Sequence, residues 1–95
     1  MILGKRFRTM EIKYSKAALK FLARADKPTV TRIREAIQGL THNPPEGDIK
    51  IMQGFSDGRQ RLRVGKYRVI YKYGIDNELE IVYIIDIGSR GDIYK

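Results

Sequence analysis

Three arginines, Arg59, Arg61 and Arg63, alternate with other residues along one short stretch of the sequence. Successive side chains of a β-strand point to opposite faces, so this spacing predicts that all three lie on one face of a strand. Guanidinium groups remain charged and hold phosphate oxygens through forked hydrogen bonds. The row therefore indicates a surface that binds a polyanion and stabilises negative charge on a phosphate.

Arg68 extends this row beyond the tight turn that follows it. If Val64-Gly65 forms a two-residue turn, Arg61 lies opposite Arg68, and Leu62 pairs with Tyr67 on the other face. Like charges placed directly opposite each other destabilise a sheet, so folding alone does not explain such a pair. Solvated side chains that point apart are the alternative, but four arginines on one face favour anion binding.

Other candidate residues are isolated in the sequence. His42, the only histidine, falls at the end of a predicted helix, where histidine suits the helix dipole. Glu46 stands in a loop with no marked partner, and Asp86 could pair with an arginine. Arg90 either returns to the arginine face or is an ordinary loop residue. Tyr94 is either an apolar anchor for the tail or a platform for a base.

Metal-ligand spacings, glycine-rich phosphate loops and nucleophile motifs do not occur in the sequence. We therefore expect no metal and no cofactor. The sequence also has no pair of histidines to act as the acid and base of a ribonuclease. The arginines are thus left without an obvious general base.

The elements that position these residues begin with a strand and two helices. Residues 11–14 alternate as a strand, Ser15 is a good helix N-cap, and apolar residues then recur at helical spacing. Pro28 suits the first turn of a second helix, and Asn43-Pro44-Pro45 ends it. The apolar stripe predicted for the second helix is Val30, Ile33, Ile37 and Leu40.

Beyond Gly58 the apolar pattern changes to period two. Residues 60–64, 67–73 and 79–87 are predicted strands joined by short turns, and Lys50-Ile51-Met52 is a short extended piece before them. The fold class is therefore α+β in the order β-α-α-β-β-β. We expect a four-stranded, mainly antiparallel sheet in which the last three strands form a meander, with both helices on one face.

Composition narrows the setting in which the protein acts. The 95 residues carry a net charge of +8, which favours a polyanion as partner: nucleic acid, an anionic membrane or an acidic protein. There is no cysteine, which suits a reducing cytoplasm, and no apolar run near the roughly 20 residues of a membrane span. Residues 1–9 are basic without the apolar core of a signal peptide, so we expect a disordered extension before a single domain over residues 10–95.

Two stretches carry a resemblance to a known family. They are residues 61–71, RLRVGKYRVIY, and residues 83–94, YIIDIGSRGDIY. In these stretches and in the order of its elements, the sequence resembles the toxins of the RelE/ParE superfamily from about Met10 to its end. The resemblance implies a RelE-like toxin that cleaves messenger RNA at the ribosome without a metal. It also implies an acidic cognate antitoxin, encoded beside the toxin, that neutralises it.

The resemblance also implies which residues form the site. Two arginines and a C-terminal tyrosine of RelE-type enzymes fall on Arg68, Arg90 and Tyr94, with a shorter spacing between the last two. Two lysines of those enzymes fall on Arg59 and Arg61. The full expectation is a catalytic set of Arg61, Arg68, Arg90 and Tyr94, with Arg59, Arg63 and Lys66 binding RNA.

The change from lysine to arginine affects the chemistry. A guanidinium stays protonated, so Arg61 is a poor general base and is expected to stabilise charge instead. Tyr94 is one candidate for proton transfer. The chain also lacks the glutamate and histidine pair of the YoeB-like branch. Two alternatives remain: a non-enzymatic, ParE-like inhibitor of DNA gyrase, and a degenerate member that binds only its antitoxin.

Overall fold

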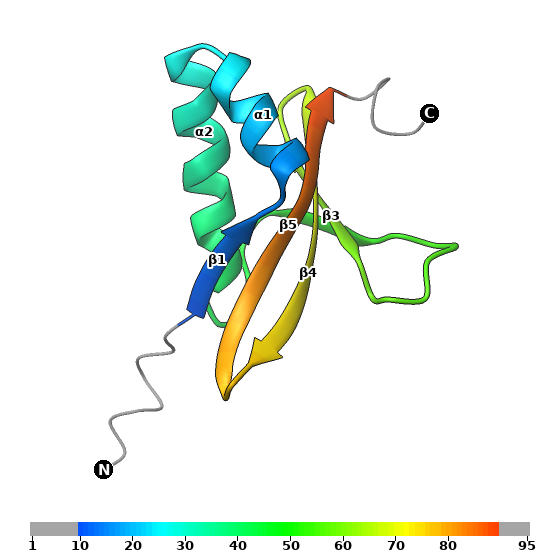
Figure 1. Ribbon diagram of the computed structural model, residues 1–95. Coiled ribbons are helices and arrows are strands. Elements are labelled where there is room, and N and C mark those ends of the chain that lie inside the picture. Colours follow the sequence, from blue (N-terminus) through cyan, green and yellow to red (C-terminus); the bar gives the residue numbers. More distant parts are fainter. Residues whose placement is uncertain (1–9, 90–95) are drawn as a thin grey trace.

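The computed structural model describes residues 10–89 as a five-stranded sheet with two helices on one face (Figure 1). The spatial order of the strands is β1-β5-β4-β3-β2; β1 runs parallel to β5, and all other neighbours are antiparallel. The strands are β1 (Met10–Tyr14), β2 (Asp48–Ile51), β3 (Gln60–Val64), β4 (Tyr67–Asp76) and β5 (Leu79–Ser89). The extension expected at residues 1–9, Arg90 and Tyr94 lie outside the described residues.

The predicted α+β class, the meander of β3, β4 and β5, and the placement of both helices on one face are confirmed. The expected number of strands was wrong, because the piece predicted at Lys50-Ile51-Met52 overlaps a fifth strand, β2, which begins at Asp48 and ends at Ile51. This strand pairs with β3, so that Ile49 faces Leu62. Four residues are too few for a clear period-two pattern, and their pairing with β3 defines the strand.

The helices begin where their capping residues predicted. In α1 (Lys16–Arg24), the Ser15 hydroxyl accepts a hydrogen bond from the Ala18 N–H at 3.0 Å. The same hydroxyl donates to the Ile85 carbonyl at 2.7 Å, which ties the start of α1 to β5. Pro28 lies in the first turn of α2 (Lys27–Gln38), and a 3-10 turn, Gly39–Thr41, follows α2.

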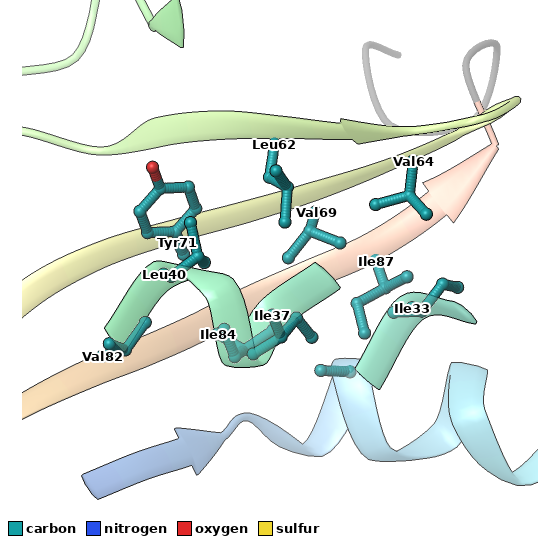
Figure 2. Packing of buried hydrophobic residues seen from close by; sticks show 11 residues of the cluster. Ile33, Ile37, Leu40, Leu62, Val64, Val69, Tyr71, Val82, Ile84 and Ile87 are labelled. Atoms are coloured by element: carbon teal, nitrogen blue, oxygen red, sulfur yellow. The ribbon is translucent and has the colours of Figure 1, made fainter. Parts of the chain in front are cut away.

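The core lies between α2 and the sheet. Ile33 and Ile37 of α2 and Leu40 are fully buried against the helix-facing side of the sheet (Figure 2). The sheet contributes Leu62, Val64, Val69, Tyr71, Val82, Ile84 and Ile87 to the same cluster. Because strands alternate, the residues between these core positions point to the opposite face of the sheet. The opposite face carries none of this cluster.

The register of β3 with β4 differs from the expected one by two residues. The turn is Gly65-Lys66, so Arg63 lies opposite Arg68 and Arg61 lies opposite Ile70. Gly65 has a φ of +61°, which glycine adopts readily at the first position of a tight turn. Because a shift of two preserves the faces, the arginines still share one face, although the expected pair of Arg61 with Arg68 was wrong.

We expect Ile37→Ala to lower the free energy of unfolding by about 2–5 kcal/mol, because it leaves a cavity between α2 and the sheet. Ile75→Ala is the matched control, since Ile75 is 74% exposed. Its expected effect is below about 0.5 kcal/mol. Urea unfolding of the three proteins measures both changes. Equal losses for the two variants would contradict the burial of Ile37 between α2 and the sheet.

Candidate nucleic-acid interface

The sheet face opposite the helices carries six cations, which we call the basic face: Lys50, Arg59, Arg61, Arg63, Arg68 and Lys72. The strand registers explain how they gather. Lys50 of β2 pairs with Arg61 of β3, and Arg63 pairs with Arg68 of β4. Lys72 follows Arg68 by four residues on the same strand, so it points the same way. Several sequence-distant cations are therefore neighbours on one rigid surface.

Asp48 partly neutralises this face. It pairs with Arg63 across β2 and β3, and its two carboxylate oxygens lie 3.6 Å from Arg61 Nη2 and 3.8 Å from Arg63 Nη1. The Asp48 side chain is half exposed, so water screens both ion pairs. Such contacts reduce the repulsion between the two arginines and hold them loosely enough for a stronger anion to compete.

Arg68 is the least neutralised arginine of the basic face. It is 6% exposed, and its Nη1 donates to the Tyr67 carbonyl at 3.5 Å, a long hydrogen bond. Within residues 10–89 no carboxylate forms an ion pair with it. Burial of a charge without an opposite charge is unfavourable. An anion bound beside Arg68 would supply the missing negative charge.

A shallow groove of about 510 Å³ opens at Arg68 and Arg61. The other lining residues are Lys50, Ile51, Met52, Gln53 and Phe55. The groove thus places two guanidinium groups and an ammonium group beside apolar and aromatic side chains. This combination suits a nucleotide, which has a charged phosphate and a flat base.

Arg59 is fixed at one end of the basic face by two contacts. Its Nε and Nη2 donate to the Asp57 carboxylate at 3.1 and 2.9 Å, and its Cζ lies 4.3 Å from the centre of the Phe55 ring. The hydrogen bond from the Arg59 side chain lowers the pKa of Asp57 to about 2. Asp57 also lies 3.6 Å from Lys72 Nζ, so one carboxylate serves two cations.

The structure brings together only part of the expected site. Arg59, Arg61, Arg63 and Arg68 share the basic face, whereas Arg90 and Tyr94 lie outside the described residues. Lys66 lies away from the groove, with its Nζ 5.5 Å from the Tyr67 ring centre on the helix-facing side.

The acidic and histidine candidates also lie outside the groove. His42 Nδ1 is 3.2 Å from Glu46 Oε1, in the segment that follows α2. The Asp86 carboxylate accepts a hydrogen bond from the Ile87 N–H at 2.9 Å. Among residues 10–89, the hydrogen-bond donor to Asp86 is therefore a backbone amide and not an arginine.

Sequence analysis missed Lys50 and Lys72. Lys72 has the same parity as Arg68 on β4, so the period-two pattern could have placed it on this face. The position of Lys50 on this face depends on the pairing of β2 with β3, which no local pattern indicates. Asp48 and Asp57, which bind the arginines, were missed because an ion pair between strands requires the register.

Two kinds of feature are absent from residues 10–89. No three side chains of the kinds that ligate metals lie close enough together to hold an ion. None of the helices in this range combines the length and the apolar character that a membrane span requires.

Comparison with known proteins gives a family and a fold. A family model described as the ParE toxin of the type II toxin–antitoxin system, parDE, matches residues 12–94. Among curated proteins, none matches the chain. The archaeal RelE–RelB complex of Pyrococcus horikoshii OT3 contains a similar chain, with 28% identity and a TM-score of 0.66 over 88% of this chain and 98% of that one.

Two more distant structures share the fold. The YoeB/ParE toxin from Agrobacterium tumefaciens has 17% identity and a TM-score of 0.70, and the match covers 85% of this chain and 99% of that one. The RelB–RelE antitoxin–toxin complex from Methanococcus jannaschii has 24% identity and a TM-score of 0.61, with 86% and 94% covered.

The contact between Arg59 and Asp57 predicts an unusual titration. The pKa of Asp57 is lower in the folded protein than in the unfolded chain, where it is about 3.9. The contact with Arg59 therefore stabilises the fold fully above about pH 3.9, and this stabilisation is lost as the pH falls through about 2. Carboxyl-carbon NMR should give a midpoint near 2 for Asp57. In Arg59→Gln the midpoint should rise toward about 3.9. A midpoint near 4 in the parent protein would show that the contact does not form.

Proposed function

The chain belongs to the family of ParE toxins of type II toxin–antitoxin systems, within the RelE/ParE superfamily, and we propose that it cleaves messenger RNA at its basic face. The observation that carries this proposal is the convergence of Arg61 and Arg68 on one groove, where Arg68 is nearly buried and has no acidic partner among residues 10–89. A phosphodiester in the groove would balance that charge.

The proposed reaction begins at the ribose next to the scissile phosphate. The 2′-oxygen loses its proton and bonds to phosphorus, and the bond from phosphorus to the 5′-oxygen breaks. The products are a 2′,3′-cyclic phosphate and a 5′-hydroxyl, which takes up a proton. Negative charge on the phosphate oxygens grows along this path, and fixed guanidinium donors of Arg61 and Arg68 would stabilise it.

The other expected residues complete the proposed site. We assign Arg90 to the same phosphate, and Arg59 and Arg63 to neighbouring parts of the RNA backbone. Lys66 would meet RNA only outside the groove. A guanidinium cannot exchange a proton at neutral pH, so another group must do so. We assign this step to Tyr94 or to Lys50, the one lysine that lines the groove within the described residues.

Two further facts support an RNA substrate, and we place its cleavage at the ribosome only on the resemblance to RelE-type toxins. The whole chain carries a net charge of +8, which favours association with a nucleic acid. The similar chain from Pyrococcus horikoshii is described as part of a RelE–RelB complex, and RelE-type toxins are the group that the sequence resembles in its arginine stretch. An activity at the ribosome would place the protein in the cytoplasm.

A second candidate function is inhibition of DNA gyrase without catalysis. The observation in its favour is that the family model matching residues 12–94 is that of ParE toxins. Under this alternative the arginines would not act on a phosphate, and growth arrest would survive their loss. A supercoiling assay with purified gyrase distinguishes the two functions directly.

We expect Arg68→Ala and Arg90→Ala to abolish growth arrest and to lower the cleavage rate by roughly a hundredfold to a thousandfold, the usual effect of losing one such donor. Arg24→Ala, an exposed arginine at the end of α1, is the control and should behave as the parent. Mapping of transcript 5′ ends after induction measures cleavage. Circular dichroism and antitoxin binding verify the fold.

Because Arg68 is nearly buried, Arg68→Lys provides a second test. This variant keeps the positive charge but removes the paired guanidinium donors that bind two phosphate oxygens at once. It should fold and still cleave poorly. The gyrase alternative would be favoured if the parent protein left transcripts uncut and inhibited DNA supercoiling by gyrase. Growth arrest by both alanine variants at the parent's rate would refute the proposed catalytic set.

We also expect a cognate antitoxin that is acidic and partly disordered, because two solved relatives are described as toxin–antitoxin complexes and the cations of the basic face attract an acidic chain. Co-purification with the protein encoded by the neighbouring gene should recover a stable complex. Charge pairing predicts faster dissociation at high salt. The same purification with an unrelated basic protein is the control, and recovery of no neighbour from the native operon would contradict the expectation.

A further inference from the structure

We propose that Phe55 stacks on a nucleobase of single-stranded RNA, next to the phosphate held by Arg61 and Arg68. This inference rests on the proposed function for the choice of RNA as ligand. It goes beyond that function because it assigns a positioning role to a residue outside the arginine set. The juxtaposition that carries it is an aromatic ring and two guanidinium groups lining one groove.

Phe55 is an aromatic residue that the core does not use. It lies in the loop between β2 and β3 and is 46% exposed, and it is absent from the buried cluster between the helices and the sheet. Figure 1 shows this loop, in bright green, projecting from the sheet on the side away from the helices. A half-exposed ring on a projecting loop gains little from folding, but it offers a flat apolar surface to a ligand.

The ring is held in place by charged neighbours. Arg59 lies over it, with Cζ 4.3 Å from the ring centre, and Asp57 fixes the guanidinium of Arg59 through two hydrogen bonds. A cation over an aromatic face is attractive in itself. The guanidinium of Arg59 therefore covers part of the Phe55 ring, and another part of the ring lines the groove. The contact with Arg59 thus favours one orientation of the ring beside the groove before any ligand arrives.

The chemistry of the groove favours a single-stranded nucleic acid over other polyanions. Phosphate oxygens suit Arg61 and Arg68, and a base attached to the same strand can reach the neighbouring ring. In a duplex the bases are covered by their neighbours, so they cannot stack on a side chain. Any base can stack on phenylalanine, so we expect the protein to bind single-stranded RNA with little sequence preference.

The test uses a tryptophan at this position as a reporter. The chain has no tryptophan, so Phe55→Trp introduces a single fluorophore that can still stack. The probe is a short single-stranded RNA with 2′-O-methyl riboses, which cannot be cut. We expect base-dependent quenching of the tryptophan by this RNA. A strand of the same length with abasic sites should bind the arginines but leave the fluorescence unchanged.

Affinity gives a second, independent readout. Phe55→Leu, which keeps an apolar side chain but not the ring, should weaken binding of the 2′-O-methyl RNA by about tenfold, the usual effect of losing one base–aromatic stack. Its urea-unfolding midpoint should match that of the parent, because Phe55 lies outside the core. Leu19→Ala is the matched control: Leu19 is 52% exposed but lies on α1, and its loss should leave RNA affinity unchanged.

The results separate this inference from the proposed function. Base-dependent quenching by the parent-like Phe55→Trp protein, with no cleavage of messenger RNA on translating ribosomes, would support the stacking role and overturn the nuclease. Cleavage with parental affinity in Phe55→Leu would keep the nuclease and overturn the stacking role. Equal quenching by the abasic strand would also overturn stacking, since the phosphates alone would then account for the change in fluorescence.

Discussion

The pairing of β3 with β4 through the Gly65-Lys66 turn is the constraint on which the rest of the structure depends. It sets which side chains of both strands enter the core and which form the basic face. A slip of one residue would exchange the two faces, placing arginines under α2 and core residues such as Leu62 in water. Burial of the apolar face against the helices therefore also fixes the arginines on the other face. Stability of the core and geometry of the site have the same origin.

The same turn shows how much of this arrangement the sequence determines. Alternation is a local property, so it correctly predicted the shared face of Arg61 and Arg63 on one strand. Arg68 shares that face because the turn has two residues, as predicted, which preserves the parity between the strands. The choice between a turn at Val64-Gly65 and one at Gly65-Lys66 depends on the positive φ of Gly65 and on the packing of both strands. Local alternation cannot distinguish two registers that keep the same parity, and for this reason the predicted cross-strand partner was wrong.

The short edge strand β2 marks the limit of prediction from local pattern. Its four residues have no strong alternation and gain their hydrogen bonds only from β3. Because β2 was not predicted as a strand of the sheet, the positions of Lys50 and Asp48 beside Arg61 were not predicted either. The helices were easier to predict, because Ser15 and Pro28 act within one turn of the chain. Contacts that depend on distant partners were thus missed, whereas local signals were sufficient.

The charges of the basic face are unevenly balanced, and this imbalance indicates where a ligand would bind. Asp57 is bound tightly to Arg59 at one end, while the looser contacts of half-exposed Asp48 serve Arg61 and Arg63. Arg68, which pairs with Arg63 at the end of the face farthest from Arg59, has no ion pair among residues 10–89 and is nearly buried. The guanidinium of Arg68 donates to the Tyr67 carbonyl and not to a carboxylate of residues 10–89. An anion that binds there therefore does not have to displace a carboxylate of this part of the chain. Fixed donors beside an open groove require little reorganisation, the condition under which electrostatic stabilisation of a developing charge is most effective.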